Sequence, residues 1–310
     1  MKSMHRRILA LLVAAAALTA EERVTLVPTG DRRSILVAER TGRVYWSGGA
    51  VHGAYKYDRG SVIWSIDRSG RREDFLFTRT ASGVECVAAA ADGTLAVLAG
   101  LTLYRISPDH SRVNWIDGPA PFYAHAVSVT DDGRMWAIGR EYDRRERGFG
   151  EYLVLKGYDP DGKLSSSQII RLRVPDRYSR WEYERRALAD STLAAAGSRV
   201  AWLTSFGQYI EFAPGGQQVF YAEPPEDLEF EIDKASLAIS PSGETYLAMN
   251  VEDVCALSWL ERRTGKWIPV ELEGEELEFG SRLLGFDGSD LVALDAGLER
   301  GGFLTRWRRR

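Results

Sequence analysis

The sequence predicts an all-β protein, a six-bladed β-propeller with four-stranded antiparallel blades, and two observations carry that prediction. The first is a repeated unit of two short apolar runs around a glycine-rich turn, as in LAISPSGETYLAM at residues 237–249. Runs of this length and alternation are typical of half-buried and fully buried strands. Similar units surround six glycines: Gly30, Gly93, Gly133, Gly197, Gly243 and Gly288.

The second observation is a further strand that follows each unit, carries an aromatic residue and ends in a polar turn. Residues 101–111 (LTLYRISPDHS) and 152–163 (YLVLKGYDPDGK) are examples, and another apolar run usually comes next. Four short strands, repeated about every 45 residues, are the pattern of a β-propeller. A β-sandwich is the alternative, but it does not require a repeat of constant length.

Taken in chain order, the six units predict six blades, each with its first strand nearest the axis of the ring. Blade 1 is expected to begin with a strand at residues 24–28, before the turn at Gly30. Blade 6 is expected to be incomplete, because its last run, GGFLTRW, is its third strand and no fourth follows. No N-terminal strand is left over, so we expect closure by simple packing of blade 6 against blade 1.

The first twenty residues have the composition of a signal peptide. Three cations precede an apolar run at residues 8–18, and small residues follow. The run is shorter than the ~20 apolar residues of a spanning helix. We therefore predict cleavage after Ala20, or alternatively after Ala17, and an exported protein, periplasmic or extracellular, with one domain at residues 21–310. A buried N-terminal helix is the other interpretation.

Composition narrows the classes of partner. The formal net charge is −4, and removing the three leader cations makes it −7, so nothing favours nucleic acid. The apolar content of 45% and the nine tryptophans suit a chain that buries much of itself. No linker of biased composition divides the sequence, and we expect a monomer without a transmembrane segment in the mature chain.

The two cysteines are predicted to be free. Cys86 falls on the innermost strand of blade 2, and Cys255 falls at the third strand of blade 5. These blades lie on opposite sides of a six-membered ring, whereas a disulfide needs Cα atoms within ~7 Å.

Every sizeable insertion falls on one face, which carries the loops between second and third strands and the links between blades. The insertions are expected at residues 39–61, 140–151 and 175–188. Their aromatic residues are candidate contacts for a protein, a peptide or a carbohydrate: Trp46, Tyr55, Tyr178, Trp181 and Tyr183. The alternative is that aromatic residues staple these loops to the rim, with arginines stacked on them.

The starts of the innermost strands offer a second candidate site. Each carries an ionisable residue, and the set is Glu22, Glu85, His125, Asp190, Lys234 and Arg282. These side chains are expected to ring the mouth of the central channel and to bind a ligand. Ordinary wet channel lining is the alternative. No cofactor is expected; a divalent metal is a lesser alternative, since zinc usually takes three or four converging ligands.

Known catalytic motifs give no support for an enzyme. Residues 157–164 (GYDPDGKL) approach a phosphate-binding loop, but the last position is leucine and the context is a strand, so a hairpin turn is predicted. There is no G-x-S-x-G, H-E-x-x-H or C-x-x-C pattern.

The fragments ISPSG, VTDDG, YRISPD and GYDPDG resemble the strand-turn patterns of the six-bladed TolB-like propeller superfamily, which includes NHL-repeat and lactonase-type propellers. The resemblance covers roughly residues 22–309 and implies a fold shared by many functions. Its lactonase-type members hold a divalent metal with Glu, Asn and Asp at the channel mouth; here Glu22 and Glu85 would supply the first, and Asn114 and Asn250 are the only asparagines. We expect a binding or scaffold module that acts through the loop-bearing face, with a metal-assisted hydrolase at the channel mouth as the alternative.

Overall fold

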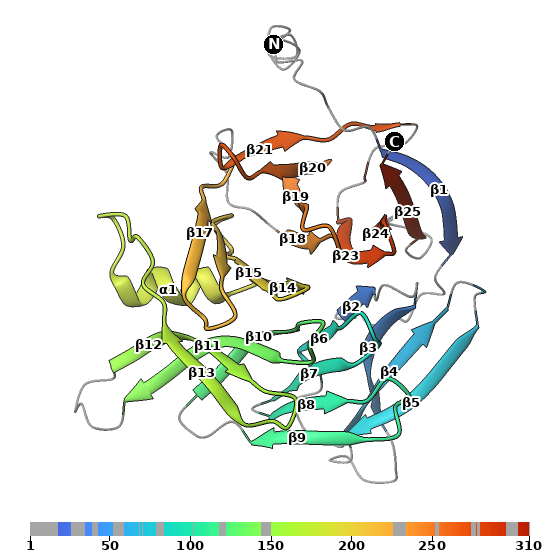
Figure 1. Ribbon diagram of the computed structural model, residues 1–310, viewed down its shortest axis with the longest axis horizontal. Coiled ribbons are helices and arrows are strands. Elements are labelled where there is room, and N and C mark those ends of the chain that lie inside the picture. Colours follow the sequence, from blue (N-terminus) through green and yellow to red (C-terminus); the bar gives the residue numbers. More distant parts are fainter. Residues whose placement is uncertain are drawn as a thin grey trace, which may run out of the picture.

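The protein forms a ring of β-sheets around a central axis (Figure 1). This computed structural model describes residues 18–25, 35–38, 43–51, 59–67, 69, 71–78, 84–100, 102–117, 122–143, 150–225, 234–251, 254–273, 277, 280–295 and 303–309. Six sheets lie within these residues, and each is a blade whose strands run outward from the axis.

Five blades follow the chain from the innermost to the outermost strand, and all their neighbouring strands are antiparallel. Blade 1 contains β2 (Ile35–Ala38), β3 (Val44–Val51), β4 (Arg59–Ile66) and β5 (Arg72–Thr78). Blade 2 contains β6 (Cys86–Ala89), β7 (Leu95–Ala99), β8 (Thr102–Ile106) and β9 (Val113–Asp117). Blade 3 contains β10 (Phe122–Val129), β11 (Met135–Asp143), β12 (Gly150–Tyr158) and β13 (Leu164–Ile169). Blade 4 contains β14 (Thr192–Ala196), β15 (Arg199–Leu203), β16 (Tyr209–Phe212) and β17 (Gln218–Ala222). Blade 5 contains β18 (Lys234–Ile239), β19 (Thr245–Val251), β20 (Val254–Glu261) and β21 (Lys266–Pro269).

The innermost strands close a complete circle. In the described residues β2 contacts β6, and the contacts continue through β10, β14, β18 and β23 (Arg282–Asp287) back to β2. The prediction of an all-β propeller built from four-stranded antiparallel blades is therefore confirmed.

Blade 6 is built from both ends of the chain. From the axis outward it contains β23, β24 (Asp290–Asp295), β25 (Phe303–Arg309) and β1 (Leu18–Thr25), with β22 (Leu272–Glu273) added in parallel outside β1. Strand β1 runs antiparallel to β25, with Leu18 opposite Arg309 and Thr25 opposite Phe303. The expectation of an incomplete blade 6 closed by simple packing was wrong, because the N-terminal strand supplies the fourth place.

Blade 1 is displaced by one strand from the prediction. Its innermost strand is β2, whereas residues 24 and 25 belong to β1 and residues 26–28 lie outside the described part. Residues 39–61 are accordingly not one long loop, since they contain all of β3 and the start of β4. An apolar run followed by a glycine turn has the same sequence pattern whether it forms the innermost strand of blade 1 or the fourth strand of blade 6. The pattern alone therefore predicted the wrong blade for the run before Gly30.

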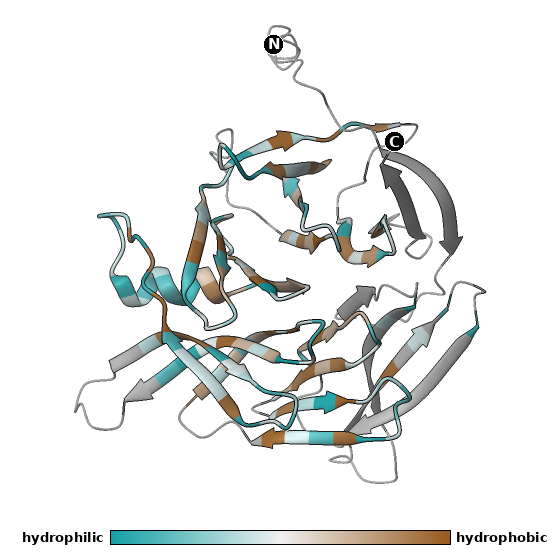
Figure 2. Ribbon diagram, viewed as in Figure 1, coloured by the Kyte–Doolittle hydropathy of each residue, from teal (hydrophilic) through white to brown (hydrophobic). Residues whose placement is uncertain are grey.

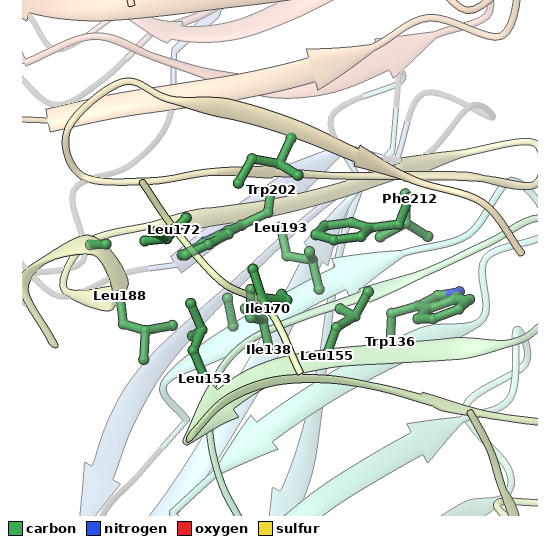
Figure 3. Packing of buried hydrophobic residues seen from close by; sticks show 14 of the residues in the cluster. Trp136, Ile138, Leu153, Leu155, Ile170, Leu172, Leu188, Leu193, Trp202 and Phe212 are labelled. Atoms are coloured by element: carbon green, nitrogen blue, oxygen red, sulfur yellow. The ribbon is translucent and has the colours of Figure 1, made fainter. Parts of the chain in front are cut away.

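Apolar side chains fill the spaces between neighbouring blades. Between blades 3 and 4, Trp136 and Trp202 are fully buried and pack with a group of leucines, isoleucines and Phe212 (Figure 3). Figure 2 shows apolar stretches along the strands and polar stretches at several turns. Among the described residues, similar buried clusters lie between blades 1 and 2, 2 and 3, 4 and 5, and 5 and 6, and this burial holds the blades together.

The face opposite the insertions carries the turns between first and second strands. Gly133 and Gly243 occupy these turns with φ of 79° and 88°, as tight hairpins require, and this prediction is confirmed. Hydrogen bonds connect the turns of adjacent blades: the backbone N–H of Asp131 donates to the Gly197 carbonyl at 3.0 Å. Arg199 Nη1 donates to the Gly243 carbonyl at 2.6 Å.

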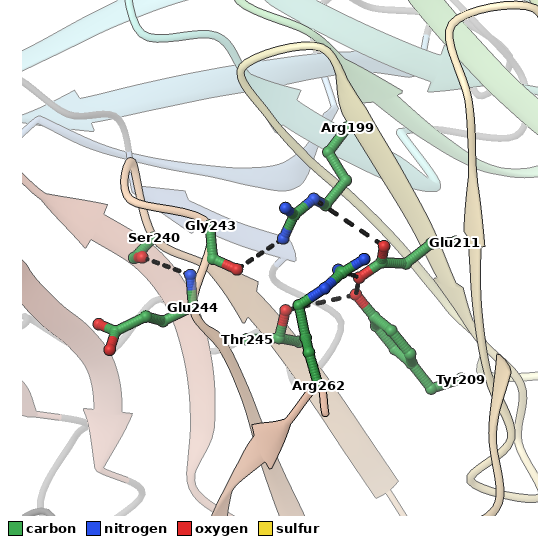
Figure 4. Close-up of polar contacts among 8 residues, drawn as sticks. All are labelled: Arg199, Tyr209, Glu211, Ser240, Gly243, Glu244, Thr245 and Arg262. Atoms are coloured by element: carbon green, nitrogen blue, oxygen red, sulfur yellow. Dashed lines mark hydrogen bonds and ion pairs between the residues drawn. The ribbon is translucent and has the colours of Figure 1, made fainter. Parts of the chain in front are cut away.

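A buried polar network joins blades 4 and 5 (Figure 4). The Glu211 carboxylate is 1% exposed, lies 3.9 Å from Arg199 Nε and also pairs with Arg262. Its Oε1 accepts a hydrogen bond from the Tyr209 hydroxyl at 2.7 Å. Burial and the Glu211 charge raise the pKa of Tyr209, so that hydroxyl stays protonated.

A short helix, α1 (Arg180–Leu188), leads into blade 4. Its N-cap is Ser179, whose hydroxyl accepts a hydrogen bond from the Glu182 backbone N–H at 3.2 Å. At nine residues, this helix of the described chain is not long or apolar enough to cross a membrane.

Candidate ligand-binding channel

A cavity of about 570 Å³ occupies the axis of the ring, between the innermost strands of blades 2 to 6. Five of these blades each contribute one ionisable or amide side chain to its lining. They are Glu85, His125, Asp190, Asn250 and Arg282, from blades 2, 3, 4, 5 and 6 in that order. The rest of the lining combines apolar residues, mainly alanines and leucines, with hydroxyl-bearing residues such as Ser128, Thr192 and Ser236.

Glu85 stands immediately before β6. Its backbone N–H donates to the Leu98 carbonyl at 2.8 Å, which fixes the residue at the end of the sheet. Burial raises the pKa of its carboxyl, and a hydrogen bond from the Gly100 backbone opposes that shift. The group is therefore a carboxylate in a partly desolvated position, where an opposite charge would be strongly attracted.

His125 is the extra residue of a β-bulge. In the pairing of β10 with β11, Ala124 lies opposite Gly139 and Ala126 lies opposite Ile138, so His125 has no partner of its own. Bulges redirect a side chain and are frequent beside functional sites. Burial, helped by the positive charge of Arg140, lowers the pKa of His125, so the imidazole that lines the cavity is neutral at pH 7.

Asp190 follows the end of α1 and precedes β14. Its φ of 54° places it in the left-handed region, where a non-glycine residue is uncommon. The next residue, Ser191, donates its backbone N–H to the Leu188 carbonyl at 3.2 Å. The Ser191 hydroxyl oxygen is buried at the cavity and has no hydrogen-bond partner among the described residues.

Arg282 opens β23, and burial lowers the pKa of its guanidinium. The backbone before it is held by Asn250, a buried amide on β19. Asn250 Nδ2 donates to the Ser281 carbonyl at 3.3 Å, and Oδ1 accepts from the Gly280 N–H at 2.7 Å. Asn250 was not among the predicted site residues. Its signal in the sequence is an amide inside an otherwise apolar strand.

Four of the six predicted channel residues line this one cavity: Glu85, His125, Asp190 and Arg282. Lys234 begins β18, the innermost strand of blade 5, but its side chain lies outside the described part. Glu22 does not belong with them. It lies on β1, the outermost strand of blade 6, opposite Arg306, because blade 1 is displaced by one strand.

The aromatic residues predicted on the loop-bearing face divide into two kinds. Tyr183 is buried and stacks on Phe206 with ring centroids 4.5 Å apart, and Tyr178 lies 5.5 Å from Tyr183. This packing supports the alternative in which aromatic residues attach the loops to the rim of the propeller. Trp46 lies on β3 rather than in a loop, and Tyr55 falls outside the described residues.

Trp181 keeps half of its surface exposed. Its ring lies under two guanidinium groups, with the Cζ atoms of Arg140 and Arg185 at 5.6 and 5.3 Å from the centroid. Arg140 is also the residue whose positive charge helps to lower the pKa of His125.

The described residues contain no group of three His, Cys, Asp or Glu side chains arranged to share a metal ion. Both cysteines are free, on blades 2 and 5 as predicted: Cys86 lines the cavity and donates to the Val127 carbonyl at 3.8 Å, and Cys255 is buried.

Comparison with known proteins supports the fold alone. No family model and no curated protein matches the chain. Among solved structures, a streptogramin B lyase is 12% identical, covering 93% of this chain and 87% of its own, with a TM-score of 0.53. A protein of unknown function from Bacteroides caccae is 13% identical over 81% of this chain and 82% of its own, with a TM-score of 0.52. Virginiamycin B lyase from Staphylococcus aureus is 9% identical over 93% and 99%, with a TM-score of 0.51. These similarities identify a β-propeller and leave the activity to the site itself.

Proposed function

We propose that this propeller is a binding module that takes a small polar molecule into its central channel from the loop-bearing face. One observation carries the proposal: five successive blades each place a polar side chain on a single cavity. Its volume, about 570 Å³, lies within the ~300–1,000 Å³ of ordinary ligand pockets. Its lining combines apolar residues with several charged and hydroxyl-bearing ones, which suits a polar ligand.

The polar groups offer every kind of hydrogen bond. Glu85 and Asp190 accept, Arg282 donates, and the neutral imidazole of His125 does both. Because burial disfavours the charged forms of Glu85 and Arg282, opposite charges supplied by a ligand would offset part of that desolvation cost. This pattern favours a charged or strongly polar ligand over an apolar one.

We further propose that the protein belongs to the TolB-like superfamily, which the six-bladed ring supports. We also propose that it is exported, which the cationic and apolar leader supports. Half-exposed Trp181, with its two arginines, supports a protein, peptide or carbohydrate contact beside the channel mouth.

A fragment library containing acids, amines, zwitterions and neutral compounds tests the channel. We expect saturation-transfer NMR to detect binders whose signal is weakened by Glu85→Gln and by Arg282→Gln, because both side chains line the cavity and neither change adds volume. Val219→Leu, on the exposed outer strand β17, is the control and should change nothing.

Binding that is unaffected by both changes in folded variants would show that the ligand lies elsewhere. Should Arg282→Gln fail to fold, Asp190→Asn replaces it, since it changes a charge without adding volume. A library without any binder would contradict the proposed function.

A further inference from the structure

We infer that the ligand of the channel is a zwitterion, whose cationic group lies between Glu85 and Asp190 and whose anionic group lies at Arg282. This inference rests on the proposed function and specifies its ligand class. Three charged residues of the lining come from three different blades. Glu85 is in blade 2, Asp190 is in blade 4 and Arg282 is in blade 6.

In a closed ring of six, blades 2, 4 and 6 alternate with blades 3, 5 and 1, so the three charged residues are spaced evenly around the axis. The half of the ring around blade 3 carries the two carboxylates, and the half around blade 6 carries the guanidinium. A molecule with one charge complements only one kind of group, whereas a molecule with both charges, correctly oriented, complements both.

Asp190 gives independent support, because two local preferences oppose aspartate at this position. The left-handed conformation costs an L-residue other than glycine roughly 1–2 kcal/mol, somewhat less for Asp or Asn. The position also follows the C-terminal end of α1, where the helix dipole disfavours a negative charge. Glycine or asparagine would suit the backbone better.

The carboxylate of Asp190 is thus a local disadvantage for the fold. Residues held in unfavourable conformations cluster at functional sites. A role in binding a cationic group accounts for aspartate at this position, which capping of the helix does not.

Ser191 adds a donor beside that carboxylate. A buried hydroxyl without a partner costs free energy, and the Ser191 oxygen is buried at the cavity with no partner among the described residues. A ligand heteroatom at this point would remove that cost. On the opposite wall, Asn250 fixes the backbone of Gly280 and Ser281, which sets the direction from which Arg282 enters the channel.

These observations assign the ligand to compounds with an ammonium and a carboxylate, such as amino acids and short peptides. The test compares glycine, 4-aminobutyrate, 6-aminohexanoate and glycylglycine with singly charged compounds of similar length: butylamine, butyrate, hexylamine and hexanoate. Titration calorimetry with the full mature chain measures each affinity. We expect at least one zwitterion to bind at least 10-fold more tightly than both of its singly charged analogues.

Asp190→Asn separates a binding role from a structural one. Asparagine adopts the left-handed conformation readily and carries no charge at the helix end, so we expect Tm to rise by a few degrees. Zwitterion affinity should fall at least 10-fold, to the level of the singly charged acid. Asp159→Asn is the matched control: it makes the same change of charge in the turn after β12, and affinity should stay unchanged.

Two further variants examine the other groups. Ser191→Ala should leave Tm unchanged or higher while weakening the zwitterion. Arg282→Gln should weaken the zwitterion to the level of the amine, and Arg282→Lys should restore part of the loss.

The inference is overturned if singly charged analogues bind as tightly as the zwitterions, or if Asp190→Asn keeps full affinity. It is also overturned if no compound of this panel binds while other fragments occupy the channel. That last result would leave the proposed function intact, whereas a channel that binds neither panel nor library would remove both.

Discussion

Replacing Gly139 with alanine tests whether the bulge that presents His125 depends on close approach of two strands. A Cβ at residue 139 would lie 2.0 Å from the Tyr123 carbonyl oxygen and 2.8 Å from the Ala124 Cα. Both are backbone atoms and cannot rotate away. Strand β10 must therefore move from β11 at the bulge itself.

The size of the effect follows from two opposing contributions. Overpacking a well-packed site costs roughly 1–3 kcal/mol, and more when backbone must move. Exchanging glycine for alanine returns about 0.4–1 kcal/mol through the unfolded chain. We expect a net loss of about 2 kcal/mol in the free energy of unfolding, measured by urea denaturation, and a fall in Tm of roughly 4–8 °C. The imidazole resonances of His125 should shift as the bulge moves.

Gly197→Ala is the matched control. Gly197 lies in the turn after β14, with φ of +61° and no atom within 4 Å of an added Cβ. Alanine there should cost only about 1 kcal/mol of backbone strain and leave the His125 resonances in place. If Gly139→Ala proved as stable as the unmodified protein, or if His125 did not respond, the argument that the bulge requires glycine would fail.

Three further predictions concern pH, the interior and the N-terminus. Because the folded-state pKa of His125 lies below 6.5, the unfolded chain takes up the proton first, so stability should fall as pH drops below about 6.5; His125→Gln should flatten that part of a urea–pH series, and an unchanged slope would be contrary evidence. Glu211→Gln should cost about 2 kcal/mol in urea denaturation, because a carboxylate that is 1% exposed loses its charge-assisted hydrogen bonds with Arg262 and Tyr209, whereas Glu261→Gln, at a carboxylate that is 32% exposed, should stay within about 0.5 kcal/mol; equal effects would refute the difference. If the leader is cleaved as proposed, the intact mass of the product should correspond to cleavage after Ala17, since cleavage before residue 21 would remove three residues of β1; a mass beginning at residue 21 would oppose that expectation.

Blades 2 to 5 could be predicted from the sequence because their strands pair locally. The turn at Gly133, for example, joins β10 to β11, and the turn at Gly243 joins β18 to β19. Each hairpin needs only a few consecutive residues, so the apolar pattern and the turn glycine are enough to identify it.

Two long gaps between turn glycines looked alike and had different causes. Both the gap from Gly30 to Gly93 and the gap from Gly133 to Gly197 were interpreted as insertions. The second does contain one, the link with α1. The first contains all four strands of blade 1, because the run before Gly30 belongs to blade 6. No local pattern distinguishes the two cases, since the partner of β1 is at the other end of the chain.

The site residues at the starts of innermost strands could be predicted from the sequence. The features that depend on the conformation around the end of α1 could not. Glu85 and His125 were found because equivalent positions in successive blades face one axis. The unpartnered hydroxyl of Ser191 has no signal in the sequence, because its burial depends on how α1 meets β14. The left-handed conformation of Asp190 is equally invisible until the helix end is placed.

Closure of the ring also determines what the channel can bind. Because β1 completes blade 6, the chain forms six blades, and blades 3 and 6 then lie on opposite sides of the axis. Arg282 consequently lies across the channel from His125, and Glu85 and Asp190 lie on the two blades beside that histidine. With one blade more or fewer, the same residues would meet at different angles around the axis. The pairing of β1 with β25 on the rim therefore sets the arrangement of charges at the centre.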